Sequence, residues 1–146
     1  MARLVIYFCL IFSTACKNTS SSSKAYDLEM CIRSGGKYHS IYMDKSGNSV
    51  VEKGKGTFYD EDLKKETVEE SKTFKVESDS VRSFISNLEK LKRDPIKTSK
   101  RLDASRVEIY LEGQKIYDSY SWDSSFWDMI RPIIRQIPKQ FNPFMS

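Results

Sequence analysis

Two hydrophobic periods follow one another along the chain, and together they limit the folds it can adopt. Every second residue is apolar or aromatic at Tyr26, Leu28, Met30 and Ile32, as expected of a strand with one buried face. Over residues 81–91 the spacing changes to intervals of three and four, which lines one face of a helix. A chain that uses both periods is predicted to contain both strands and helices.

Turn sequences divide the first half of the domain into short strands. Strands are predicted over residues 26–33, 38–43 and 50–59. Gly54 and Gly56 favour a bulge or a sheet edge within the third strand. The charged segment 60–70 is expected to be a loop, followed by a short strand over 72–76.

A second hairpin is predicted over residues 107–120, with its turn at Glu112 and Gly113. The length of the turn decides which residue of the return strand faces the core. A two-residue loop would put Asp118 on the apolar face, whereas a three-residue loop would put Tyr117 there. We favour the longer loop because an unpaired carboxylate on the core side is costly.

A last helix is expected to begin after Asp123 or Ser124. Its apolar stripe consists of Phe126, Ile130, Ile133 and Ile137. Pro132 lacks a backbone N–H and is expected to kink or divide this helix. Two phenylalanines in the tail indicate that the C-terminus packs back onto the body.

The predicted order is therefore four strands, a helix, two strands and a helix. This order indicates an α+β domain over residues 26–146, with an antiparallel sheet of about six strands and both helices on one face. The length of 146 residues suits one such domain.

The N-terminus has the order of residues found in an export signal. Arg3 precedes a nine-residue apolar block, residues 4–12, and small residues lead to Cys16. A helix of nine residues is about 14 Å long, less than half of the roughly 30 Å hydrocarbon core of a bilayer. The block is therefore interpreted as a signal and not as a membrane span.

The segment that ends in Ala15 and Cys16 resembles a bacterial lipoprotein signal peptide. The resemblance implies cleavage before Cys16 by the type II signal peptidase and acylation of Cys16, which would anchor the chain to a membrane of the bacterial cell envelope. Residues 1–15 would be the signal and 16–25 a lipidated, Ser-rich tether. Ser13 stands where that family usually carries leucine, and Ser13 with Ala15 also fits ordinary cleavage, which would leave Cys16 as a free thiol.

Of the three cysteines, Cys9 leaves with the signal and Cys16 carries lipid. Cys31 would then remain alone, and no intramolecular disulfide is expected. Under ordinary cleavage, Cys16 and Cys31 would be able to pair.

The composition argues against several classes of function. The formal net charge of +4 is small and its signs are interspersed, so nucleic-acid binding is not expected. His39 is the only histidine, which excludes histidine-clustered metal sites, and no cofactor motif is found. An envelope hydrolase that uses carboxylates such as Asp60 and Asp62, or a serine with His39, remains an alternative.

Aromatic residues in and after the second hairpin are the candidate binding residues. Tyr110, Tyr120 and Trp122, with Tyr117, can stack on sugars or anchor a protein partner, although core packing explains them too. The prediction is a non-catalytic envelope lipoprotein that binds a protein or glycan of the periplasm or cell surface. A structural or assembly lipoprotein without a ligand site is the second alternative.

Overall fold

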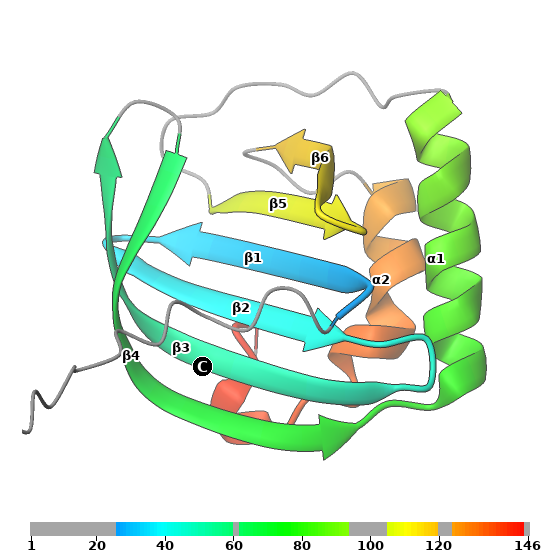
Figure 1. Cartoon of the computed structure of the whole chain (residues 1–146), viewed down its shortest axis with the longest axis horizontal. Helices are drawn as coiled ribbons and strands as arrows, with labels where there is room; N and C mark the ends of the chain where they lie inside the picture. The colour runs from blue at the N-terminus through cyan, green and yellow to red at the C-terminus, as the bar shows by residue number, and fades with distance from the viewer. Residues whose placement is uncertain (1–25, 60–61, 94–104, 120–123, 145–146) are drawn as a thin grey trace, which may run out of the picture.

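The computed structural model describes residues 26–59, 62–93, 105–119 and 124–144. The elements are β1 (Leu28–Ser34), β2 (Lys37–Met43), β3 (Asn48–Tyr59), β4 (Asp62–Lys75), α1 (Ser78–Arg93), β5 (Arg106–Leu111), β6 (Gln114–Ser119), α2 (Ser124–Ile134) and the 3-10 helix η2 (Lys139–Phe141). The six strands form one antiparallel sheet in the order β4-β3-β2-β1-β5-β6 (Figure 1). The predicted α+β class and element order are confirmed.

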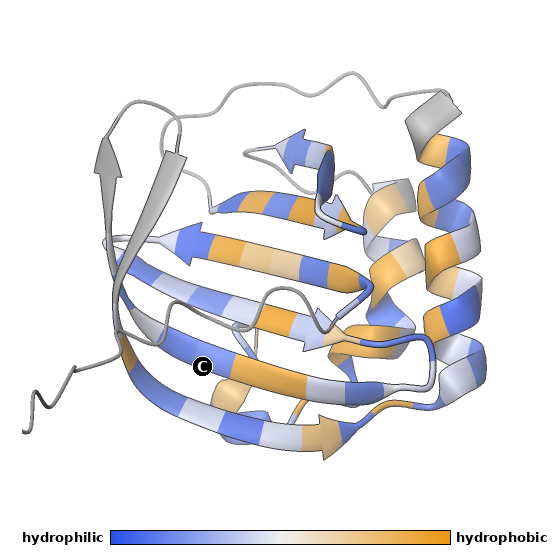
Figure 2. Cartoon of the chain, in the orientation of Figure 1, coloured by the Kyte–Doolittle hydropathy of each residue, from blue (hydrophilic) through white to orange (hydrophobic). Residues whose placement is uncertain are grey.

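One face of the sheet, here called the helix face, carries the apolar residues of the strands. Ile109 of β5, Met30 of β1, Ile41 of β2 and Val51 of β3 form a continuous cross-strand row at its centre, and all four are fully buried. The apolar stripes of α1 and α2 join the same core cluster. In Figure 2 the hydrophobic residues of α1 gather on the side toward α2 and the sheet. β1, β2, β5 and both helices thus bury the face that their period predicts.

The prediction of a loop over residues 60–70 is wrong from residue 62 on, whereas residues 60 and 61 lie outside the described part of the chain. β4 runs from Asp62 to Lys75 and pairs with β3 along its length, with register shifts at Lys53/Gly54 and Lys55/Gly56. Its residues do not alternate between apolar and polar because β4 is an edge strand, most of whose described side chains face water. The shifts lie at Gly54 and Gly56, where a bulge was expected in β3, but the extra residues, Glu66 and Glu69, belong to β4.

The preferred loop length of the second hairpin is also wrong, although the face it assigned to Tyr117 is correct. The turn has only two residues, Glu112 and Gly113, both with positive φ, and β6 pairs Gln114 with Leu111. A register shift beyond Tyr110 inserts one extra residue in β6. Tyr117 therefore lies on the helix face, where its ring stacks on Phe126 with 4.0 Å between centroids.

The C-terminal segment closes the helix face. α2 continues through Pro132 and ends at Ile134, so the proline does not divide it. Phe141 is buried in the core cluster, and the ring of Phe144 meets that of Trp127 edge-on at 5.0 Å. The expectation that the tail packs back is confirmed. Within the described ranges, neither helix combines the length and apolar content that crossing a membrane requires.

The turn between β2 and β3 is tied to the junction of β4 and α1 through Gly47. The carbonyl oxygen of Gly47 accepts a hydrogen bond from the amide of Val76 at 2.8 Å. Gly47 has a φ of 86°, and a Cβ there would lie 2.0 Å from the carbonyl oxygen of Val76. Only glycine fits this position without displacement of the backbone.

Gly47→Ala is therefore expected to lower the free energy of unfolding by about 3 kcal/mol or more, since left-handed strain adds to an overpacked contact. Gly113→Ala is the matched control, because Gly113 has a φ of 79° with no atom within 4 Å of the added Cβ. Gly113→Ala should lower the free energy of unfolding only by the backbone strain, about 1–2 kcal/mol. Urea denaturation measures both variants, and equal losses would contradict the contact at Val76.

Candidate ligand-binding site on the far face of the sheet

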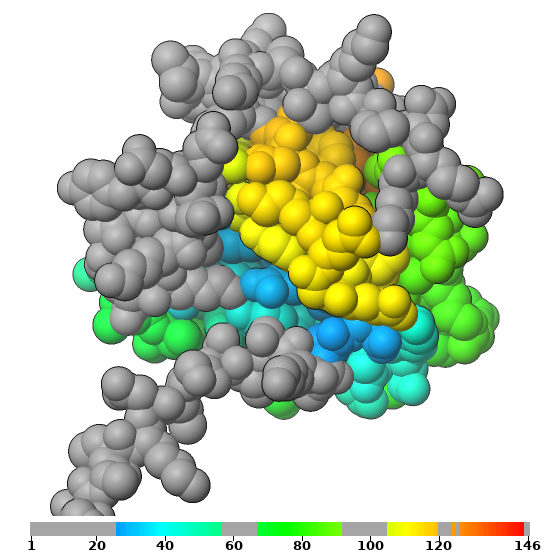
Figure 3. Space-filling model, turned by 45° about the horizontal axis from the view of Figure 1, so that its top comes forward, coloured from blue at the N-terminus to red at the C-terminus, as the bar shows by residue number. Residues whose placement is uncertain are grey.

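The second face of the sheet, here called the far face, is turned away from α1 and α2 and is predominantly polar. Three cross-strand rows cross it at β1. The first joins Tyr42, Glu29 and Tyr110, the second Ser40, Cys31 and Glu108, and the third Tyr38, Arg33 and Arg106. In Figure 3 the surfaces of β1 and β2 adjoin that of the β5–β6 hairpin, which lets residues distant in sequence meet here.

A buried carboxylate, Glu108, organises the middle of this face. Its side chain is 1% exposed and accepts hydrogen bonds from Arg33 and from Lys115, the latter at 2.9 Å. The guanidinium of Arg106 lies 3.4 Å from the same carboxylate and also forms a two-pronged contact with Asp118, 2.7 Å from Nε to Oδ1. Five charged groups from β1, β5 and β6 thus share one hydrogen-bonded cluster.

The cluster alters the pKa of the groups at its edge. Burial alone would raise the pKa of Asp118, but hydrogen bonding and the charge of Arg106, with a further contribution from Lys115, lower it below the ordinary value. Burial alone would lower the pKa of Lys115, but the hydrogen bond and charge of Glu108 raise it. Both groups are therefore charged at neutral pH, and the cluster is a fixed ionic framework.

A cavity of about 550 Å³ lies beside this cluster and is the candidate binding site. We call it the tyrosine pocket; its lining comprises Tyr26, Asp27, Glu29, Tyr42, Tyr110, Glu112 and Gly113. Three tyrosines and three acidic residues therefore line the same space.

The pocket is built mainly on rigid strands. Glu29 of β1 pairs with Tyr42 of β2 on one side and with Tyr110 of β5 on the other, so the carboxylate stands between two aromatic residues. The ring of Tyr26 lies 5.7 Å from that of Tyr42, centroid to centroid. Tyrosines on paired strands lose little side-chain entropy when they contact a ligand.

Asp27 and Glu112, two of the acidic residues of the pocket, are held in place by backbone contacts and by Lys45. The amide of Glu112 donates to the carbonyl oxygen of Asp27 at 2.7 Å, and the amide of Lys45 donates to the carboxylate of Asp27 at 2.8 Å. The Nζ of Lys45 is 3.0 Å from Glu112 and 3.6 Å from Asp27. Lys45 thus pairs with two of the three acidic residues that line the pocket.

Tyr110 joins the pocket to the ionic cluster. The Nζ of Lys115 lies 5.7 Å from the centre of its ring, within the range of a cation–π contact. Burial, followed by the negative charge of Glu108, raises the pKa of Tyr110, so its phenol stays protonated and can donate a hydrogen bond. Aromatic faces beside carboxylates suit ligands that carry a positive charge on an otherwise apolar stem.

Two of the aromatic residues named as candidates from the sequence lie in the described part of the chain. Tyr110 lies in the pocket, whereas Tyr117 belongs to the core. Tyr120, Trp122 and Cys16 lie outside the described residues, as does Asp60 of the hydrolase alternative.

The other two tyrosines of the pocket were not predicted as binding residues, and one of them, Tyr26, was placed on the wrong face. Tyr26 was predicted to share the apolar face with Leu28, but it precedes β1 and turns toward Tyr42. Tyr42 was not singled out, although its alternation with Ile41 and Met43 assigns it to the polar face.

Glu108→Ala tests whether the ionic cluster maintains this face. Removal of the carboxylate leaves three cations around a buried position and should lower the free energy of unfolding by about 3–5 kcal/mol. Glu112→Ala removes the same group from an exposed pair with Lys45, which water screens, and should cost about 0–1 kcal/mol. If urea denaturation gives the two variants similar stabilities, Glu108 does not have this role.

Comparison of the chain with protein-family models, curated proteins and solved structures finds no match. Among the residues that the structure describes, no group of three His, Cys, Asp or Glu side chains is arranged to hold a metal ion. The assignment of a function therefore rests on the shape and chemistry of the site itself.

Proposed function

We propose that the protein is a non-catalytic, lipid-anchored binding module of the bacterial cell envelope. Its domain would bind a protein partner that inserts a lysine or arginine side chain into the tyrosine pocket. The anchor is inferred from the lipoprotein-like segment that ends at Cys16, and the binding role from the far face of the sheet.

The observation that carries the proposal is the row Tyr42, Glu29 and Tyr110, in which a carboxylate stands between two aromatic residues at the pocket. A cationic group gains from the ring faces and from the carboxylate at once, since both present negative electrostatic potential. The apolar stem of lysine or arginine would lie against the rings while its charge reaches Glu29.

A glycan is the second candidate ligand, because tyrosine rings also stack on sugars and their hydroxyls form hydrogen bonds. The three carboxylates favour a cationic group over a neutral sugar. The two classes differ in charge, so a pair of probes separates them.

The position of the pocket fits an anchored module. Tyr26 and Asp27 line the pocket and directly follow the segment 16–25, which would connect the domain to lipid on Cys16. Two or three acyl chains give stable attachment, since each buried methylene contributes about 0.8 kcal/mol. A ligand bound at the pocket would thus be held close to the membrane surface.

Cys16→Ala is expected to move the protein from the membrane fraction to the soluble fraction, because the acyl chains would have no attachment point. Cys9→Ala is the control, since Cys9 lies in the segment that cleavage removes. Fractionation of cells that express each variant, with mass spectrometry of the mature N-terminus, checks both. Unchanged membrane association of Cys16→Ala would refute the anchor.

Glu29→Gln tests the pocket. Tri-lysine amide should cause saturable changes in the amide NMR signals of residues 26–29 and 110–113, and Glu29→Gln should weaken its binding about tenfold through loss of one charged contact. Glu52→Gln is the matched control, because Glu52 lies on the far face at β3 outside the pocket lining.

Two outcomes would contradict the proposed ligand. If Glu29→Gln and Glu52→Gln lose equal affinity for tri-lysine amide, the peptide binds through general charge attraction and not in the pocket. Saturation by an uncharged oligosaccharide, with no response to tri-lysine amide, would assign the pocket to a glycan instead. Thermal denaturation of each variant ensures that both remain folded.

A further inference from the structure

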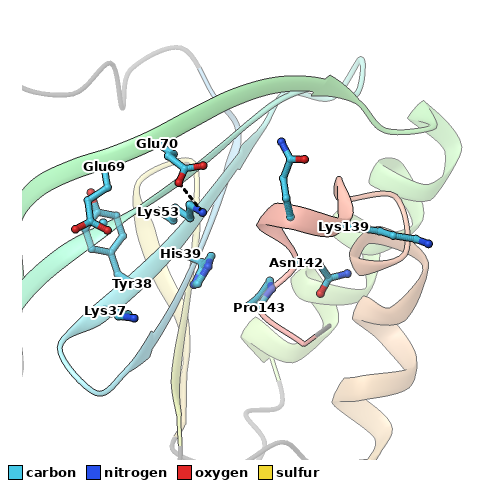
Figure 4. Close-up of a pocket in the computed structure, with 11 residues that line it drawn as sticks. Lys37, Tyr38, His39, Lys53, Glu69, Glu70, Lys139, Asn142 and Pro143 are labelled. Carbon is cyan, nitrogen blue, oxygen red and sulfur yellow. Dashed lines mark ion pairs between the residues drawn. The ribbon is translucent and has the colours of Figure 1, made fainter. Parts of the chain in front are cut away.

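A second cavity lies on the helix face, on the opposite side of the sheet from the tyrosine pocket. Its volume is about 530 Å³, and we call it the His39 cavity. Its walls come from β2, β3, β4 and the C-terminal segment. They consist of Lys37, Tyr38, His39, Lys53, Gly54, Glu69, Glu70, Lys139, Gln140, Asn142 and Pro143. Figure 4 shows the ring of His39 between the strands and the segment that carries Asn142 and Pro143.

The cavity exists because one cross-strand row changes from apolar to polar. This row begins with Val107 of β5 and Ile32 of β1. It continues across the sheet with His39, Lys53 and Glu70. The first two are buried in the core, whereas the last three lie under the C-terminal segment. These three charged or titratable side chains on the inner face of a small sheet are not needed for packing.

The negative groups of the cavity are already neutralised. Glu70 is paired with Lys53, 2.8 Å from Oε1 to Nζ, and Glu69 is paired with Lys55 at 3.2 Å. Lys53 is fixed further by the ring of Phe141, 5.3 Å from its Nζ. These contacts leave the carboxylates unable to repel an anion strongly.

The positive groups are not all neutralised. In the part of the chain that the structure describes, Lys37 and Lys139 have no ion pair, and both line the cavity. Burial, followed by the charges of Lys53 and Lys37, lowers the pKa of His39. The imidazole is thus neutral at neutral pH, with one N–H to donate and a second nitrogen that a bound anion would induce to take up a proton.

The C-terminal wall is held firmly enough to form one side of a site. The amide nitrogen of Asn142 donates to the carbonyl oxygen of Ile134 at 3.0 Å, and its amide oxygen accepts from the backbone of Phe144 at 3.0 Å. Phe141 is buried beside it. The wall therefore does not depend on a ligand for its position.

We propose that the His39 cavity binds a phosphate-bearing ligand, with Lys37 and His39 as its main contacts. A phosphate monoester carries close to two negative charges at neutral pH and has three strong acceptor oxygens, which matches the unpaired Lys37 ammonium and an imidazole N–H. The phosphate would belong either to a soluble molecule or to a lipid headgroup. This site is independent of the tyrosine pocket, which faces the other way and attracts cations.

His39 is the only histidine of the chain, so its imidazole NMR signals report on this cavity without ambiguity. Titration of the full chain with inorganic phosphate is expected to shift these signals saturably and to raise the pKa of His39, because the phosphate charge stabilises the imidazolium. Sodium chloride at matched ionic strength should do neither. Absence of a saturable shift, or an equal response to chloride, would overturn a phosphate site, provided that the lipid measurement below is also negative.

Lys37→Gln should weaken phosphate binding about tenfold, since one charged contact is lost. Lys75→Gln is the control, because Lys75 is an exposed lysine of the same sheet that lies outside the cavity lining and makes the same change in net charge. Both positions are exposed, so both variants should fold. Equal weakening in the two variants would overturn the site.

Two further probes identify the source of the phosphate. Binding of glycerol 3-phosphate with a shift of His39 would indicate a soluble ligand. Cosedimentation with vesicles that contain phosphatidic acid, but not with pure phosphatidylcholine vesicles, would indicate a headgroup if it is lost in Lys37→Gln and kept in Lys75→Gln. Failure of all phosphate probes overturns this site and leaves the proposed tyrosine pocket untouched.

Discussion

The structure depends on the burial of a single apolar sheet face. Met30, Ile41, Val51 and Ile109 form the centre of that face, and the apolar stripes of α1 and α2 belong to the same core cluster. Burial of such side chains is worth about 1.5–3 kcal/mol each, so this layer provides the main driving force for folding. The helices do not cover the whole face, and the C-terminal segment covers the row that contains His39 and Lys53. The same constraint that builds the core thus leaves a polar cavity at its margin.

The far face is ordered by charge instead of by apolar packing. Glu108 is buried and needs several donors, and Arg33, Arg106 and Lys115 supply them from three strands. Ionic contacts of this kind demand defined geometry, because a misplaced partner leaves a buried charge unpaired. The cluster therefore fixes the side chains next to it, among them Tyr110, and gives the tyrosine pocket one rigid wall. The two faces together provide an acidic, aromatic site and a basic one on opposite sides of the sheet.

Much of the fold was predictable from residue patterns, and the errors have physical causes. β1, β2, β5 and both helices have apolar residues at the spacing of their secondary structure, because one side of each is buried. β4 has no such pattern because it lies at the edge of the sheet. Its backbone hydrogen bonds to β3 form whatever side chains β4 carries. The turn at Glu112 and Gly113 was misjudged because a bulge in β6 compensates for a short loop, and local sequence does not reveal where a bulge occurs.

Residue patterns alone were enough to predict the element order, the α+β class and Tyr110 as a candidate binding residue. The lipoprotein-like segment around Cys16 stays a prediction. Long-range pairing put Tyr42, Glu29 and Tyr110 in one row and brought His39 and Lys53 to the tail near Asn142. Such pairing is not readable from local patterns, because strand order and register depend on the sum of many long-range contacts, whereas the period of a strand or helix depends on which side of that element is buried.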